Sequence, residues 1–204
     1  MKIALIDYGA GNATSVERAL HKLGAASQRV NTPDKLQSAE VLLLPGVGHY
    51  GALIRSLDEN NLRAPLRNAI QRGVPFLGIC LGLQALFDSS EEAPELRGLG
   101  LLPGKVTALP ATVKLPHMGW NRVRAVNESR LLRGLDGEHF YFAHSYAVGV
   151  NSQSGSNSVA GICEHGETFT AVLEENNIFG TQFHPEKSGE SGARLLNNFL
   201  ELAR

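Results

Sequence analysis

The sequence predicts an α/β fold, in which a mostly parallel central sheet is flanked by helices and antiparallel strands are added in the C-terminal half. Through the first half, apolar runs alternate with segments of helical periodicity, the pattern of strands joined by helical crossovers. Residues 41–44 are apolar at every position, as in strands buried on both faces of a parallel sheet. Beyond Ser89 the predicted strands alternate apolar and polar residues, which favours antiparallel pairing.

The first half is predicted to alternate strands with helices. Val16, Leu20 and Leu23 recur at helical spacing, and Gly24 follows them as a stop signal. Turns follow the first, third and fourth predicted strands, so we expect residues 9–12, residues 46–48 and Cys80 along one edge of the sheet. The strands are expected at residues 2–7, 27–30, 41–44 and 76–79, and the helices at 14–23, 52–58, 62–72 and 81–87, with a short helix before the third strand.

The second half is predicted to contain further strands and one final helix. Leu195, Leu196 and Phe199 recur at helical spacing within residues 192–203. Residues 151–158 are polar, and a solvated hairpin connection is favoured there over a mobile lid. The strands are expected at residues 105–109, 121–126, 140–150, 159–163, 169–174 and 178–183.

The composition predicts a globular protein and excludes several classes. The 204 residues suit one domain spanning residues 1–204. A net charge of −1 gives no indication of a basic surface for nucleic acid. The sequence has no run of 18 apolar residues, so no membrane span is expected. The N-terminus lacks the features of a signal peptide, and two cysteines are too few for a disulfide framework, so a cytoplasmic location is expected.

Cys80 is the candidate nucleophile. It follows a short apolar run, precedes a helix-like segment, and has Gly78 and Gly82 two residues away on either side. This is the spacing of a nucleophile elbow, a sharp strand-to-helix turn whose neighbours must lack side-chain bulk. The alternative is a buried cysteine that acts as a small core residue.

His184 is the strongest candidate base among the seven histidines, because it follows an apolar run and precedes Pro185. Proline disfavours the helical conformation in the residue before it, so an extended His184 is expected. Glu186 lies two residues further on, where its carboxylate would reach the imidazole and steady the imidazolium. A plain strand end followed by a loop glutamate is the alternative.

Two backbone donors are needed to stabilise an oxyanion. The Leu81 amide would lie at a helix N-terminus, and the loop Gly46-Val47-Gly48 would supply the second donor. A phosphate loop or a plain turn would also explain this loop, but the Gly-Lys-Ser/Thr of a nucleotide P-loop is missing. No cluster of cysteines and histidines has the spacing of a metal site, so no metal is expected.

Together these residues are typical of a cysteine-dependent acyl transferase or hydrolase. Cys80 would attack an amide or ester carbonyl, and water would then hydrolyse the thioester. His184 would act first as base and then as acid. The residue pattern does not specify the substrate.

The chain resembles the class I glutamine amidotransferases, which use a cysteine–histidine–glutamate triad. The resemblance runs the length of the chain and is strongest at residues 78–84 and 183–186. It implies a flavodoxin-like fold and the hydrolysis of L-glutamine to glutamate and ammonia, with no cofactor. It also assigns roles to three groups of residues. They are the triad Cys80, His184 and Glu186, the oxyanion region Val47, Gly48 and Leu81, and the substrate-holding positions Gln84, Glu92, Ser145 and Tyr146.

Other segments resemble, within this family, the glutaminase subunits of imidazole glycerol phosphate synthase. They are residues 7–12, 45–48, 116–121, 144–146 and 184–188. The resemblance implies a separate cyclase subunit with a (β/α)8 barrel fold, which uses the ammonia to convert the nucleotide PRFAR to imidazole glycerol phosphate and AICAR. Ammonia loses its nucleophilicity when it is protonated in bulk water, and little sequence follows His184, so we expect the acceptor site on another chain.

Five residues are predicted to face this partner: Met118, Trp120, Asn121, Tyr141 and Lys187. Tryptophan and tyrosine are favoured interface anchors, although a local core would explain the three large side chains equally well. One rival function is a glutaminase subunit of another synthase, such as that of pyridoxal phosphate synthesis, which residues 116–121 oppose. The other rival is a non-catalytic regulatory or scaffold subunit, which the intact triad opposes.

Overall fold

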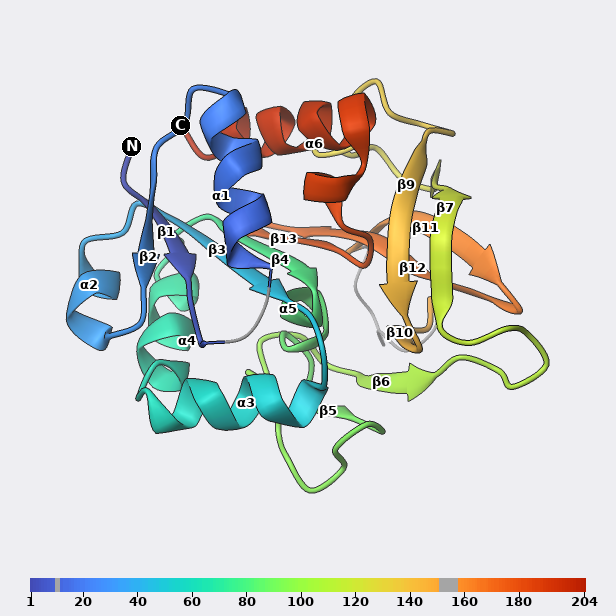
Figure 1. The fold of residues 1–204 in the computed structure, drawn as a ribbon, viewed down its shortest axis with the longest axis horizontal. Helices are drawn as coiled ribbons and strands as arrows, with labels where there is room; N and C mark the ends of the chain where they lie inside the picture. Colours follow the sequence, from blue (N-terminus) through green and yellow to red (C-terminus); the bar gives the residue numbers. More distant parts are fainter. Residues whose placement is uncertain (10–11, 151–157) are drawn as a thin grey trace.

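The computed structural model describes residues 1–9, 12–150 and 158–204 (Figure 1). Its largest element is an eight-stranded sheet with the order β2-β1-β3-β4-β13-β12-β11-β8. The strands of this sheet are β1 (Ile3–Ile6), β2 (Ser27–Val30), β3 (Val41–Gly46), β4 (Phe76–Cys80), β8 (Arg124–Ala125), β11 (Val159–His165), β12 (Glu167–Glu175) and β13 (Ile178–Thr181).

The sheet confirms the predicted fold class. The first five strands of this order pair in parallel, and β12, β11 and β8 extend the sheet with antiparallel pairs. Antiparallel β13–β12 pairing begins where the chain no longer returns through a helix, because a short turn suffices between antiparallel strands.

Helices cover both faces of the parallel part. Alternate residues of each strand point to opposite faces, so Leu5 and Leu43 pack with one set of helices and Ile6 and Leu44 with the other. The first set is α1 (Ala13–Lys22) and α6 (Gly189–Leu202), and the second includes α3 (Tyr50–Glu59) and α4 (Arg63–Gln71) (Figure 1). The short helix α2 (Pro33–Gln37) precedes β3 as predicted.

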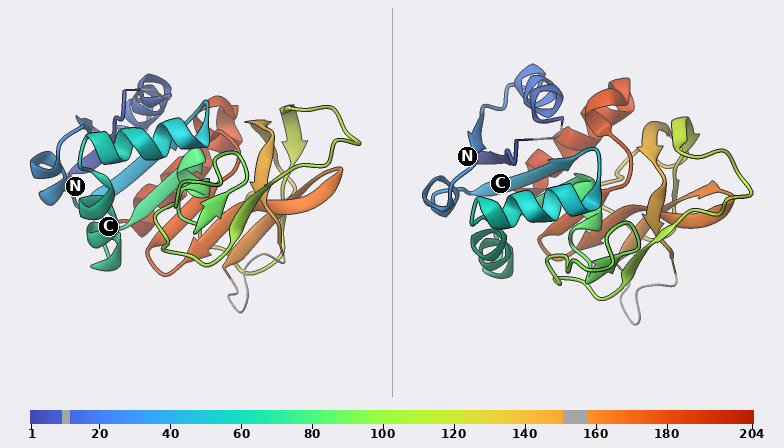
Figure 2. Two further views of the ribbon diagram at one scale, coloured as in Figure 1. Left: turned by 90° about the horizontal axis from the view of Figure 1, so that it is seen from below. Right: turned by 60° about the horizontal axis from the view of Figure 1, so that its bottom comes forward.

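Smaller sheets stand beside the antiparallel end of the large sheet. Strands β7 (His117–Arg122) and β9 (His139–His144) form an antiparallel ribbon, which Figure 2 shows at the side of the molecule away from the N-terminus. Strands β10 (Tyr146–Val148), β6 (Lys105–Ala108) and β5 (Ser89–Ser90) form a third sheet.

Three predicted elements are wrong in their extent. The strand expected at 140–150 breaks at Ser145, because β9 pairs with β7 whereas β10 pairs with β6. The strand expected at 121–126 is divided in the same way between β7 and β8, and Val123 is buried between them. The helix expected at 81–87 ends after one turn as α5 (Leu81–Gln84), because the carbonyls of residues 85–87 accept from amides of residues 99–102.

Two predicted segments lie wholly or partly outside the described residues. They are the middle of the turn at 9–12 and nearly all of the polar loop at 151–158. Within the described residues, no helix is both long and apolar enough to cross a membrane.

The carboxyl ends of β1, β3 and β4 meet at one edge, as expected. Gly46 at the end of β3 is the register partner of Cys80 at the end of β4. The Val47 amide, just beyond β3, donates to the hydroxyl of Tyr8 beyond β1 over 3.3 Å. The predicted loops therefore converge at this edge.

Gly82 in α5 offers a test of this packing. A Cβ atom at Gly82 would lie 1.8 Å from the carbonyl oxygen of Leu44 in β3, so Gly82→Ala forces two backbone segments apart. We expect the free energy of unfolding, measured in urea, to fall by about 3 kcal/mol or more. Gly51→Ala in α3 is the matched control, because its Cβ would meet Ala93 at 3.1 Å and alanine favours the helix. Equal losses in both variants would contradict this reading of the packing.

Candidate active site

Cys80 lies at the turn from β4 into α5 with a φ of 53°, in the left-handed region that residues other than glycine rarely adopt. The conformation is held by close packing around the turn. A Cβ atom on Gly78 would lie 2.5 Å from the carbonyl oxygen of Gly82. The strain and the flanking glycines are those of the predicted nucleophile elbow.

His184 and Glu186 form a buried pair. His184 is extended, with φ −101° and ψ 94°, and its Nδ1 atom lies 2.8 Å from Oε1 of Glu186. The glutamate lies in the 3-10 turn η1 (Pro185–Lys187), so this turn, rather than a continued strand, brings its carboxylate to the ring. Because a carboxylate only accepts, Nδ1 carries a proton, and Nε2 is the ring nitrogen that Glu186 leaves free.

Asn12 is a third member of this group that sequence reasoning missed. Its Nδ2 atom donates to Oε1 of Glu186 over 2.6 Å instead of capping α1, although Asn12 stands at the N-cap position. A cap residue whose side chain points elsewhere breaks a local preference, and such departures are expected at functional sites. Asn12 thereby orients the carboxylate that orients His184.

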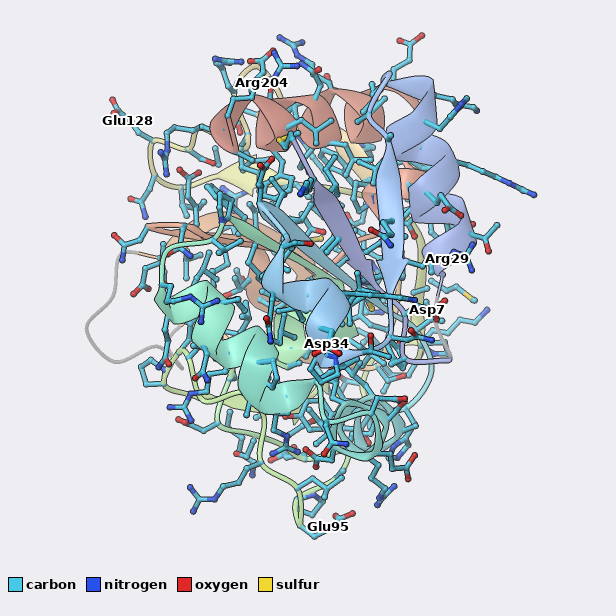
Figure 3. The ribbon with its side chains drawn as sticks, turned by 90° about the vertical axis from the view of Figure 1, so that its left-hand side faces the viewer. Asp7, Arg29, Asp34, Glu95, Glu128 and Arg204 are labelled. Atoms are coloured by element: carbon cyan, nitrogen blue, oxygen red, sulfur yellow. The ribbon has the colours of Figure 1, made fainter. Side chains whose placement is uncertain are left out.

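A set of ion pairs holds α1, and with it Asn12, against the sheet. Arg29 of β2 contacts Glu17 of α1 at 2.8 Å and Asp7 beyond β1 at 3.6 Å, and Figure 3 shows the labelled Asp7 and Arg29 near one another. The side chains are partly exposed, so each pair is worth only a fraction of a kcal/mol.

The electrostatics favour a proton on His184. Burial lowers the pKa of His184, but hydrogen bonding to and charge on Cys80 and Glu186 outweigh burial and raise it to about 10. The Nε2 atom is buried and has no hydrogen bond of regular geometry within the described residues. A protonated imidazole beside a cysteine is an arrangement that activates cysteine nucleophiles.

A small pocket of about 40 Å³ opens beside Cys80. This volume is well below the roughly 300–1,000 Å³ of small-molecule sites, so the lining side chains must move apart to admit a ligand the size of an amino acid. It brings together every predicted oxyanion and substrate residue, and adds Ala143 and His144. The lining residues are Val47, Gly48, Cys80, Leu81, Gln84, Glu92, Ala143, His144, Ser145 and Tyr146.

The backbone amides near Cys80 differ in availability. Leu81 is the first residue of α5, where an amide has no partner within the helix. Gly48 has a φ of 95°, in the left-handed region that favours glycine. The Val47 amide, in contrast, donates to the Tyr8 hydroxyl, so in this structure it is not free to face an oxyanion.

Gln84 and Gln182 connect the pocket to the thiol. Gln84 Nε2 donates to the Tyr146 carbonyl at 2.8 Å and to Gln182 Oε1 at 3.1 Å, and Gln182 Nε2 lies 3.6 Å from Cys80 Sγ. Gln182 is fully buried and was not predicted. It lies two residues before His184, so the two-residue period of an extended chain was the available signal.

The side chain of Glu92 reaches the N-terminus of α3 from a separate segment, and its Oε2 accepts from the Tyr50 amide at 2.7 Å. A carboxylate is favoured at a helix N-terminus by the partial positive charge there. It is the one carboxylate among the residues that line the pocket. The helix thus holds a negative charge at the rim of the site.

Residues 4–203 match the family model described as glutamine amidotransferase class-I. The chain belongs to the class I glutamine amidotransferase family. It is 46% identical over 202 residues to the imidazole glycerol phosphate synthase subunit HisH of Methanothermobacter thermautotrophicus, covering 99% of each chain. The protein of that name from Aquifex aeolicus is also 46% identical, over 205 residues that cover 100% of this chain and 98% of the relative.

Solved structures support the fold of this amidotransferase. A crystal structure titled glutamine amidotransferase matches with a TM-score of 0.80 and 20% identity, covering 100% of this chain and 99% of that one. The structure of PurLQS from Thermotoga maritima matches with a TM-score of 0.77 and 21% identity, covering 100% and 99%. At this identity the likeness speaks for the fold alone.

The residues predicted to face a partner are divided between the surface and the interior of the amidotransferase. Met118 and Trp120 are 66% and 57% exposed, which excludes a local core for these two side chains. Tyr141 is half-buried, and the Lys187 ammonium lies over its ring at 5.8 Å from the centroid. Asn121 instead points its amide at His117, at 3.1 Å. Contact with a partner stays a prediction for all five.

Alkylation by iodoacetamide distinguishes the two cysteines of the amidotransferase. Burial raises the pKa of Cys163 to about 12, whereas Cys80 lies in the pocket beside His184. We expect mass spectrometry to find Cys80 modified and Cys163 spared. His184 stays protonated at neutral pH, because its pKa is raised to about 10.

His184→Ala removes the imidazolium and should slow the modification of Cys80 at neutral pH about tenfold or more. Cys163→Ala is the control and should leave the rate unchanged. Preferential modification of Cys163 would refute the choice of nucleophile.

Proposed function

We propose that this chain is the glutaminase subunit of an imidazole glycerol phosphate synthase. It hydrolyses L-glutamine to glutamate and ammonia and passes the ammonia to a cyclase subunit. The observation that carries the chemistry is the strained Cys80 beside the His184–Glu186 pair, at a pocket that gathers the predicted oxyanion and substrate residues. Full-length relatives at 46% identity support the choice of synthase.

In the first half-reaction, the Cys80 thiolate attacks the side-chain amide carbon of glutamine and forms a tetrahedral oxyanion. The imidazolium of His184 then protonates the leaving nitrogen, so the carbon–nitrogen bond breaks and ammonia leaves behind a thioester. In the second half-reaction, His184 takes a proton from water as the water attacks the thioester. Glutamate leaves, and Cys80 and His184 regain their starting protonation.

The oxyanion forms next to the start of α5, where the Leu81 amide serves as one donor and the Gly46–Gly48 loop as the other. Gly48 is the loop donor that needs no rearrangement of a bonded amide. Val47 contributes only when its amide leaves the Tyr8 hydroxyl. Removal of one such donor typically costs about 100-fold or more in kcat.

The pocket residues hold glutamine by both ends. Glu92 offers a carboxylate to the substrate ammonium, and Ser145 and Tyr146 also line the pocket. The Gln84 Oε1 atom is buried without a partner among the described residues and is available to the substrate. Burial without a hydrogen bond is costly for an amide oxygen, which favours a ligand group at this position.

The ammonia acceptor is the cyclase subunit, a (β/α)8 barrel that converts PRFAR to imidazole glycerol phosphate and AICAR. Met118 and Trp120 offer it exposed anchors, with Asn121, Tyr141 and Lys187 around them. A glutaminase subunit of another synthase would share the site chemistry but would not respond to this cyclase. A non-catalytic scaffold would show no glutaminase turnover with any partner.

Cys80→Ser tests this assignment in the reconstituted complex. Glutamine-dependent formation of imidazole glycerol phosphate should fall at least about 1,000-fold, because serine is a far weaker nucleophile beside a histidine tuned to a thiol. Synthesis from added ammonium should stay within about twofold, since the cyclase site is unchanged. Loss of both activities would contradict the role of Cys80.

Lys187→Ala tests the coupling between partner docking and the triad. Lys187 directly follows Glu186, and its ammonium contacts the Tyr141 ring. We expect the affinity for the cyclase, or the stimulation of glutaminase turnover by it, to fall about fivefold or more. Lys35→Ala in α2, at the opposite end of the sheet, is the matched control. The coupling fails if Lys187→Ala leaves both quantities unchanged.

A further inference from the structure

Two buried histidines, His117 and His144, lie side by side between the outer ribbon and the pocket. They face each other across β7 and β9 as register partners, and His117 Nδ1 lies 3.1 Å from His144 Nε2. Both side chains are buried, and His144 lines the pocket. Neither has a role in the triad, so their hydrogen bonds need an explanation of their own.

On the pocket side, this pair is hydrogen-bonded to the backbone through His144. His144 Nδ1 lies 2.9 Å from the Tyr146 carbonyl oxygen, which also accepts from Gln84 Nε2. A carbonyl can only accept, so His144 Nδ1 carries a proton. The Nε2 atom of a neutral His144 then accepts, and His117 Nδ1 must donate to it.

The outer end is fixed in the same direction. Asn121 Oδ1 accepts from the Arg122 amide at 2.7 Å, and Asn121 Nδ2 donates to the Glu164 carbonyl at 3.0 Å. These two backbone bonds set the orientation of the amide, so Nδ2 faces His117 Nε2, at 3.1 Å, as a donor. His117 Nε2 must therefore accept, which again places the proton of His117 on Nδ1.

A single direction of hydrogen bonding thus runs from Asn121 through His117 and His144 to the Tyr146 carbonyl. It requires both rings to be neutral, because an extra proton on either ring would oppose a donor. Burial lowers the pKa of His117 to about 4, with help from His165, and lowers that of His144 to about 3, with help from His117. Among the described residues no group of three or more potential ligands could hold a metal ion, so a metal does not explain the pair.

The chain of bonds begins on the strand that carries the exposed aromatic surface. Met118 and Trp120 point outward from β7, whereas His117 and Asn121, which flank them in sequence, point inward, as the two-residue period of a strand requires. A displacement of β7 therefore moves the outward-facing Met118 and Trp120 and the inward-facing His117 and Asn121 together.

We propose that His117 and His144 are positioning residues that hold the Tyr146 carbonyl, and with it one wall of the glutamine pocket, in register with the outer strand β7. This rests on the proposed function in one respect, namely that glutamine is the ligand of the pocket. This chain of hydrogen bonds from Asn121 to the Tyr146 carbonyl, here called the relay, makes the geometry of the pocket depend on the position of β7. A partner that contacts Met118 and Trp120 acts on that strand.

Nuclear magnetic resonance of the full chain with 15N-labelled histidine tests the proton positions directly. At pH 7 both His117 and His144 should appear as neutral Nδ1–H tautomers. An Nε2–H tautomer or an imidazolium at either ring would overturn the relay. This arm does not depend on the identity of the substrate.

His117→Phe tests the positioning role in the glutaminase assay with cyclase and nucleotide present. Phenylalanine keeps the stack against Phe142, whose ring centroid lies at 4.7 Å, but removes both hydrogen bonds. We expect KM for glutamine to rise about tenfold with kcat within about twofold. His117→Gln, which retains one donor and one acceptor, should restore most of the affinity.

His165→Phe is the matched control, since its ring stacks on His117 at 4.1 Å but, within the described residues, its hydrogen bond goes to the Lys114 carbonyl. Its KM should stay within about twofold of the wild type. An unchanged KM in His117→Phe, or equal changes in the two variants, would overturn the proposal. If His117→Phe does not fold, His117→Gln and the tautomers of the wild type decide. A wild type without glutaminase activity refutes the proposed function instead, while the tautomers still report on the relay.

Discussion

The active site depends on the close approach of the β4–α5 turn to β3. Side chains are excluded at two glycines of this contact, where a Cβ on Gly46 would lie 2.5 Å from the Leu81 side chain and one on Gly82 would lie 1.8 Å from the Leu44 carbonyl. Within this contact the backbone of Cys80 is strained, with a φ of 53°. The strain fixes the direction of the thiol and of the Leu81 amide together. Nucleophile and oxyanion donor are therefore positioned by one packing arrangement.

The order of the strands brings the remaining groups to that thiol. β13 pairs in parallel with β4, so the segment after β13 delivers Gln182 and His184 to the same edge as Cys80. The start of α1 adds Asn12 from the other side, through its bond to Glu186. This convergence of strand ends follows from the general rule for parallel sheets, which is why a residue pattern sufficed to predict it.

Other features of the site could not be predicted, because they depend on long-range partners. Residues 140–150 have the composition of one strand, but their two halves pair with β7 and β6 in different sheets, and only the partners reveal the break at Ser145. Asn12 at an N-cap position predicts a cap, and its bond to Glu186 comes from tertiary contact. Gln182 could have been predicted from its position two residues before His184 in an extended segment, but the prediction considered only the triad residues there. The one-domain organisation and the cytoplasmic location stay predictions.

The buried histidines near the pocket differ in protonation although burial acts on all of them in the same direction. Burial lowers the pKa of His117, His144 and His184 alike. In His184 a carboxylate and the Cys80 thiol outweigh burial, so this ring takes a proton and can exchange it during a reaction. The hydrogen-bond partners of His144 among the described residues are a carbonyl and another imidazole, which do not compensate for desolvation, so it stays neutral and keeps one tautomer. The partner atom, rather than the depth of burial, therefore separates the histidine that moves protons from those that hold the backbone in place.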